Sequence, residues 1–111
     1  MLWFIIYIAS LLTALLGSAD AEEGVASQYG RESGHRVACG GELNEGGLTA
    51  AHNTLPCGTR VRVTNKRNGR SVKVTITDRG PFARGRVIDL TPAAAKAIGM
   101  NGTASVSVSK E

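Results

Sequence analysis

The sequence predicts a small all-β domain, a barrel of short strands with a single short helix. Several segments alternate between polar and apolar residues with a period of two, which is typical of half-buried strands. Asn68-Gly69 lies between two such segments and is a strong hairpin signal. Only the segment from Pro92 to Ile98 has the capping residues of a helix. Many short strands with one helix in so short a chain favour a small barrel.

The expected strands follow one another closely along the chain. In the clearest one, 59–64, Val61 and Val63 would face the core. The Asn68-Gly69 pair would close a type I′ turn, which needs positive φ at both positions. Thr91 is the expected N-cap of the helix, followed by a proline at the first helical position. In chain order the expected strands are 24–30, 59–64, 71–77, 86–90 and 104–108.

The first 21 residues have the pattern of a secretory signal peptide. Residues 2–16 are almost wholly apolar but too few to span a bilayer, and Ala19-Asp20-Ala21 has the small residues of a cleavage site. No Lys or Arg precedes the apolar stretch, so an uncleaved N-terminal anchor stays open. We expect residues 1–21 to be the signal peptide, residues 22–111 to form one domain, and the protein to be periplasmic or secreted.

The chain is basic, with a formal charge of +4, and removing Asp20 with the leader raises this charge by one. A basic domain can bind nucleic acid, but export and the alternation of basic residues with valine along strands disfavour that partner. An anionic wall or membrane surface fits better. A basic charge also keeps a small protein soluble, so charge alone leaves the function open.

Cys39 and Cys57 are the only cysteines of the chain. Two cysteines in an exported protein normally oxidise to each other, so one structural disulfide is expected. In the chain-entropy model, closing the loop of about 19 residues from Cys39 to Cys57 stabilises a small domain by about 3 kcal/mol. No histidine stands near them at metal-ligand spacing, and the sequence implies no metal and no cofactor.

Four polar residues beside glycine-rich turns could carry chemistry: Glu42, His52, Asp78 and Asp89. Cleaving a glycosidic bond needs a proton donor and a nearby base or stabiliser, which pairs of carboxyl groups supply. Asp78 and Asp89 flank one loop and could face one groove. Structural roles stay open for each: a turn cap for Asp78, a salt bridge for Asp89, packing for His52 and a solvated charge for Glu42.

Longer motifs resemble those of the rare lipoprotein A (RlpA) family and cover nearly all of residues 22–111. The resemblance implies a six-stranded double-psi β-barrel, as in expansins and barwin. It also implies an endolytic lytic transglycosylase that cleaves MurNAc–GlcNAc bonds of peptide-free peptidoglycan strands and leaves 1,6-anhydro-muramic ends. We expect the domain to be a monomer. The motifs are Leu48-Thr49-Ala50-Ala51-His52, Leu55-Pro56, Gly58-Thr59, Asp78-Arg79-Gly80-Pro81-Phe82, Gly85-Arg86 and Ile88-Asp89-Leu90.

The same resemblance assigns the site. His52 and Asp78 match groove residues of the family, and Asp89 matches the aspartate that does acid work in related double-psi barrels. The family glutamate lies eleven residues before the histidine, where this chain has Gly41, and Glu42 stands one position later. Because that glutamate is missing at Gly41, a non-catalytic, expansin-like glycan-binding module is the alternative function. Expected substrate contacts are Tyr29, Arg79, Phe82 and Arg86.

Overall fold

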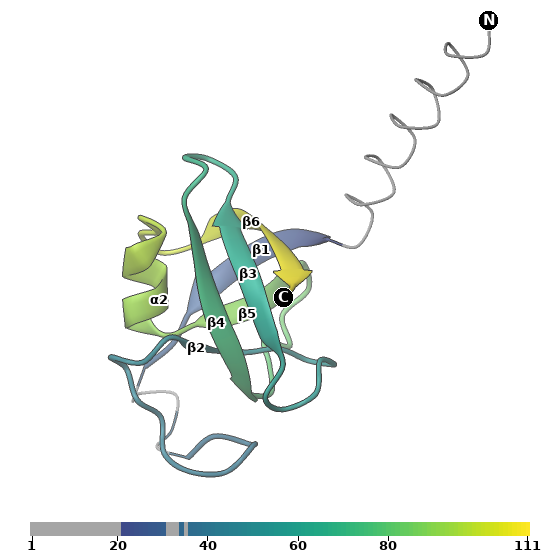
Figure 1. Ribbon diagram of the computed structural model, residues 1–111, viewed down its shortest axis with the longest axis vertical. Helices are drawn as coiled ribbons and strands as arrows, with labels where there is room; N and C mark the ends of the chain where they lie inside the picture. Colours follow the sequence, from purple (N-terminus) through teal and green to yellow (C-terminus); the bar gives the residue numbers. More distant parts are fainter. Residues whose placement is uncertain (1–20, 31–33, 35) are drawn as a thin grey trace, which may run out of the picture.

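The computed structural model describes residues 21–30, 34 and 36–111, and the leader expected over residues 1–21 lies outside them except for its last residue. The described residues form a closed barrel of six strands with one short helix packed on its side (Figure 1). No helix in this part of the chain is long and apolar enough to cross a membrane. The predicted all-β barrel with one helix is therefore confirmed.

The barrel mixes parallel and antiparallel strand pairs. Around it the strands run in the order β1-β5-β2-β4-β3-β6, and β6 pairs with β1 to close the ring. The pairs β1–β5 and β2–β4 are parallel, and the other pairs are antiparallel. In chain order the elements are β1 (Glu22–Gln28), β2 (Thr49–Ala51), β3 (Arg60–Asn65), β4 (Ser71–Asp78), β5 (Arg86–Leu90), α2 (Pro92–Ala97) and β6 (Ala104–Lys110).

Alternating apolar side chains fill the barrel interior. In β3, Val61 and Val63 are fully buried while Arg60 and Arg62 are exposed, as the alternation predicts. Strand β2 was not expected, because three residues are too few to show a period of two. It is recognised as a strand because it pairs with β4 and β5. The fully buried side chains are dominated by Val61, Val63, Val74, Ile76, Ile88, Leu90, Ile98 and Val106.

The β3–β4 hairpin forms, but the predicted type I′ turn is wrong. Gly69 has φ 77°, whereas no non-glycine residue described by the structure, Asn68 included, has positive φ. The Gly69 amide donates to the Asn65 carbonyl at 2.7 Å, and the Asn68 side chain donates to the Ile98 carbonyl at 3.0 Å. Asn68 therefore docks on the end of α2, and this tertiary contact decides the shape of the turn.

Helix α2 begins and ends close to the predicted positions. The Thr91 side chain accepts a hydrogen bond from the Ala94 amide at 3.3 Å and donates one to the Gly47 carbonyl at 2.7 Å. Thr91 is thus the N-cap and also ties the helix to the loop before β2. The helix ends at Ala97, with Ile98 as its C-cap.

The disulfide between Cys39 and Cys57 is formed, as predicted, with an S–S distance of 2.00 Å. It joins the loop before β2 to the loop before β3. The Cys39 amide also donates to the Thr77 carbonyl at 3.0 Å. These links hold the first loop beside the last residues of β4, where the candidate site lies.

Candidate active site

The centre of the site is Ala51, the last residue of β2. Ala51 is the register partner of Asp78 on β4 and also of Asp89 on β5. Neighbouring strands lie about 4.8 Å apart, which puts the two aspartate Cα atoms about 10 Å apart across one buried alanine. The structure therefore brings together the two carboxylates that the sequence placed at the edges of one loop.

One oxygen of Asp78 is held by backbone groups. Its Oδ1 accepts hydrogen bonds from the amides of Ala38, at 2.7 Å, and Arg79, at 2.9 Å. The turn-capping role considered for Asp78 is thus present in part. Among the described residues no group donates a hydrogen bond to Oδ2.

Asp89 is half-buried, and its Oδ1 accepts a hydrogen bond from Ser27 Oγ at 3.2 Å. Burial raises the pKa of Asp89, and the negative charge of Asp78 adds to the rise. The Ser27 hydrogen bond and the positive charge of Arg86 oppose it. Within the described part of the chain Asp89 forms no ion pair, so the salt bridge considered for it is not formed there.

The Tyr29 hydroxyl is buried and has no partner within hydrogen-bond distance among the described residues, although Thr77 and Thr49 lie close enough to lower its pKa. Burial raises the pKa of Tyr29 to about 12, with further contributions from Asp78 and Asp89. The ring is only 6% exposed and packs in a small cluster with Val37, Leu43 and Ala51, so it offers no open face to a sugar. The hydroxyl is buried as well, so the substrate contact expected for Tyr29 stays a prediction.

Both ring nitrogens of His52 are engaged within the protein. Nδ1 accepts hydrogen bonds from the amides of Thr54, at 3.2 Å, and Leu55, at 3.1 Å. The proton must then sit on Nε2, which donates to Glu22 Oε1 at 2.7 Å. His52 is 4% exposed and organises the loop after β2, in agreement with the packing role left open for it. Sequence reasoning missed Glu22, which carries no motif.

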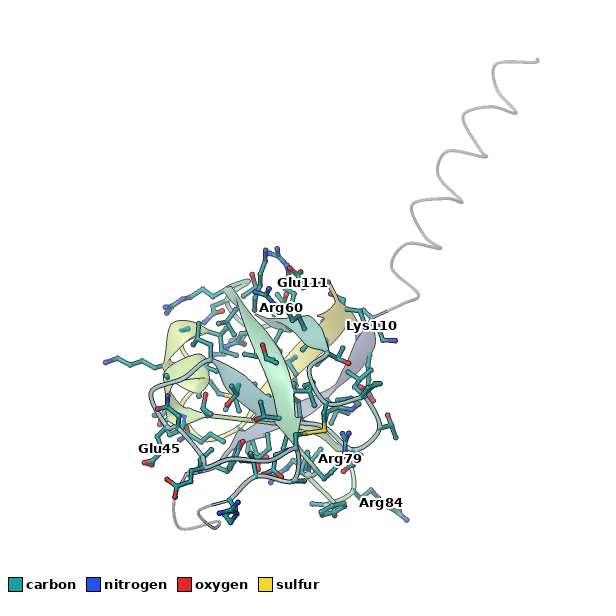
Figure 2. All side chains as sticks on the ribbon, turned by 60° about the horizontal axis from the view of Figure 1, so that its bottom comes forward. Glu45, Arg60, Arg79, Arg84, Lys110 and Glu111 are labelled. Atoms are coloured by element: carbon teal, nitrogen blue, oxygen red, sulfur yellow. A yellow bond between two sulfur atoms is a disulfide. The ribbon has the colours of Figure 1, made fainter. Side chains whose placement is uncertain are left out.

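The arginine and the phenylalanine of the loop after β4 have different surroundings. Arg79 Nη1 donates to the carbonyls of His52, at 2.7 Å, and Leu55, at 2.6 Å. Figure 2 shows Arg79 beside the disulfide, so this side chain braces the loop. Phe82 is 84% exposed and presents an open ring. Arg86 begins β5 and places positive charge near Asp89.

Glu42 stands apart from the two aspartates. Gly40 and Gly41 have φ of 102° and 90°, and they make a tight turn that places Glu42 opposite Arg36. Glu42 is exposed, and no hydrogen bond or ion pair between described residues links it to Asp78 or Asp89. The structure does not bring this carboxylate into the pair.

Comparison with known proteins places the chain in a family. Residues 21–109 match the family model described as lytic transglycolase. A probable endolytic peptidoglycan transglycosylase RlpA of Nostoc sp. is 58% identical over 84 residues, which is 73% of this chain and 23% of the relative. The corresponding Synechocystis protein is 56% identical over 103 residues, 86% of this chain and 32% of the relative. The chain thus spans a third or less of these relatives' length.

Solved structures of other proteins share the fold of this domain. An expansin of Clavibacter michiganensis has a TM-score of 0.64 at 23% identity and covers 82% of this chain and 50% of its own. A Streptomyces papain inhibitor has a TM-score of 0.63 at 25% identity and covers 81% of this chain and 93% of its own. These likenesses concern the fold, which is the predicted double-psi β-barrel. The chain is a member of the lytic transglycolase family.

Proposed function

We propose that this domain is an endolytic lytic transglycosylase that cleaves the MurNAc–GlcNAc bond in peptide-free peptidoglycan strands. The observation that carries the proposal is the pair of aspartates on either side of Ala51. Asp89 has a raised pKa, and Asp78 has one oxygen without a donor in the described part of the chain. The names of the relatives, endolytic peptidoglycan transglycosylases, support the substrate class.

In the proposed reaction Asp89 is the acid and Asp78 the base. Protonated Asp89 gives its proton to the bridging oxygen as the bond from that oxygen to muramic C1 breaks. The C6 hydroxyl of the same muramic residue attacks C1, and its proton passes to Oδ2 of Asp78. The products are a free GlcNAc end and a 1,6-anhydro-muramic end, and no water is consumed. Exchange with solvent returns the proton to Asp89.

The remaining site residues support this pair in the proposal. His52 and Arg79 hold the loop after β2, because their ring nitrogens and guanidinium are bonded within the protein. Phe82 stacks on a sugar ring with its exposed face. Arg86 limits the rise in the pKa of Asp89. Glu42 takes no part in the proton transfers.

The proposed setting is the cell envelope, outside the cytoplasm, where peptidoglycan lies. The disulfide agrees with such an oxidising compartment. We propose that residues 1–21 are removed as a signal peptide and that the domain then acts as a monomer. The proposed partner is the glycan strand alone, with no nucleic acid and no membrane contact.

A non-catalytic glycan-binding module is the second candidate. The turn at Gly40 and Gly41 favours it, because it leaves the family glutamate without a counterpart in contact with the aspartates. In that case the groove and Phe82 would hold a strand without cutting it.

One experiment separates the two candidates. The oxidised full chain is incubated with peptide-free glycan strands, and soluble products are analysed by mass spectrometry for anhydro-muramic ends. We expect such products from the wild type and from Glu111→Gln, a control whose carboxylate pairs with Lys73. Asp89→Asn and Asp78→Asn should each lower the rate at least about 100-fold, the usual worth of a positioned acid or base. Strands that bind to the wild type but stay uncut would favour the binding module.

A further inference from the structure

A hollow of about 360 Å³ lies outside the aspartate pair, and neither Asp78 nor Asp89 lines it. It opens where the start of β6 meets β1 and the β3–β4 hairpin. Its apolar lining includes Val25 and Met100, and its polar lining includes Arg67, Thr103 and Ser105. An apolar patch with hydroxyls and a guanidinium around it is a suitable surface for a sugar that carries an acidic group.

The hollow is on the same face of β1 as the contact to Asp89. Ser27 donates to Asp89, and Val25 lies two residues earlier on the same face of the strand, about 7 Å away. Val25 pairs with Ser105 of β6, which also lines the hollow. A glycan strand that passes from Asp89 over Ser27 therefore reaches Val25, which lines the hollow.

The β3–β4 hairpin brings positive charge to one side of the hollow. Lys66 is paired with Glu23 at 2.9 Å, whereas Arg67 and Arg70 form no ion pair with any residue that the structure describes. The Arg70 guanidinium packs on Gly99, a lining residue, because a Cβ added there would lie 2.8 Å from Arg70 Nη1. The hollow therefore has uncompensated positive charge at its rim and suits an anion.

We propose that the hollow is a distal subsite of the glycan groove and takes a muramic acid residue whose lactyl carboxylate pairs with Arg67. The occupant rests on the proposed function, since it belongs to the strand that the aspartates would cut. A stem peptide converts that carboxylate to an uncharged amide and adds bulk. The subsite thus selects peptide-free strands by charge, and Arg67 is a specificity-determining residue.

The test measures binding by the full chain, by titration and by amide shifts in NMR spectra. Peptide-free peptidoglycan oligomers carry the carboxylate, and GlcNAc-only oligomers of the same length lack it. We expect the peptidoglycan oligomers to shift the amides of Val25, Thr103 and Ser105. Arg67→Gln should weaken their binding about fivefold, as for an exposed charge pair, without changing the affinity for GlcNAc oligomers. Arg60→Gln, at the far end of β3, is the matched control and should change neither affinity.

Three outcomes would overturn the subsite. The first is an Arg67→Gln protein that binds both oligomers like the wild type, and the second is a set of shifts confined to the surroundings of Asp78 and Asp89. The third is inorganic phosphate shifting the amides of the hollow while the peptidoglycan oligomers do not. Because binding is measured apart from cleavage, shifts at the hollow without anhydro products keep the subsite and refute the lytic activity. Anhydro products without amide shifts at the hollow refute the subsite and keep the lytic activity.

Discussion

Glu22 Oε1 accepts a hydrogen bond from His52 Nε2 at 2.7 Å, which joins the first residue of β1 to the loop after β2. The other ring nitrogen of His52 holds the amides of Thr54 and Leu55. His52 therefore acts as a connector between two segments that are thirty residues apart in the sequence.

Replacing His52 tests this connecting role. His52→Ala leaves two backbone amides without their acceptor, and we expect the free energy of unfolding to fall by about 2 kcal/mol in urea titrations. Activity should fall along with stability, because the loop after β2 loses its anchor. His52→Asn keeps an acceptor near the position of Nδ1 and should restore part of both losses. A stable but inactive His52→Ala protein would instead mean that His52 touches the substrate.

The raised pKa of Asp89 makes stability depend on pH. The folded state holds this proton more tightly than the unfolded state, so stability falls as pH rises from 3.8, the ordinary value, through the folded pKa. Asp89→Asn should lack this fall in stability with pH. Above the folded pKa of Asp89, the variant should be more stable than the wild type. Urea titrations of both proteins below and above this pH range measure the difference in stability. The same pH dependence in Asp89→Asn and the wild type would contradict a raised pKa of Asp89.

Ser27 provides a second handle on the same proton. Its hydrogen bond lowers the pKa of Asp89, so Ser27→Ala should raise that pKa further. If Asp89 is the acid, the high-pH limb of the activity profile then moves to higher pH. An unmoved limb in Ser27→Ala would assign the acid role to another group.

The buried hydroxyl of Tyr29 lacks a partner among the described residues. Removing it in Tyr29→Phe takes away a desolvated polar group and should leave stability unchanged or raise it by up to about 1 kcal/mol. Thermal unfolding of Tyr29→Phe and of the wild type measures this difference. A loss of more than about 1 kcal/mol would mean that the hydroxyl has a strong partner after all.

The disulfide between Cys39 and Cys57 should contribute about 3 kcal/mol, by restricting the unfolded chain. The double serine variant and the reduced wild type should lose the same amount in urea titrations. Activity should fall more than stability predicts, because the Ala38 amide that holds Asp78 sits next to Cys39. Equal stability with and without the disulfide would contradict the chain-entropy account.

Phe82 is so exposed that its removal should not affect folding. We expect Phe82→Ala to change stability by less than about 0.5 kcal/mol and to weaken glycan binding about fivefold through lost ring contact. Leu48→Ala, another exposed apolar side chain, is the matched control and should bind as the wild type. Unchanged binding by Phe82→Ala would exclude it from the groove.

Much of the fold could be predicted because it depends on local patterns. The alternation in 59–64 and 71–77 predicted β3 and β4, and Thr91 with Pro92 marked the helix start. The three-residue strand β2 could not be predicted, because its conformation is imposed by the strands on either side. The turn at Asn68 was missed for the same kind of reason, since its shape depends on a contact with Ile98.

The site was less predictable than the fold. The motifs marked Asp78 and Asp89, but only the shared partner Ala51 shows that they form a pair. The contact from Glu22 to His52 joins residues thirty positions apart, and no sequence motif marks it. The hollow lined by Arg67 likewise needs three separated segments to exist.

The position of Ala51 between two strands has a consequence for how such a domain can diversify. One strand, β2, separates Asp78 from Asp89, so backbone hydrogen bonds between strands, and not a loop, hold the two aspartates about two strand spacings apart. Insertions or deletions in the loops around the groove, such as the one that carries Gly40 and Gly41, can therefore alter which polymer is held while the reaction distance stays constant. The strands of the barrel therefore fix the spacing of the two carboxylates, and the loops are free to change the selectivity for the polymer.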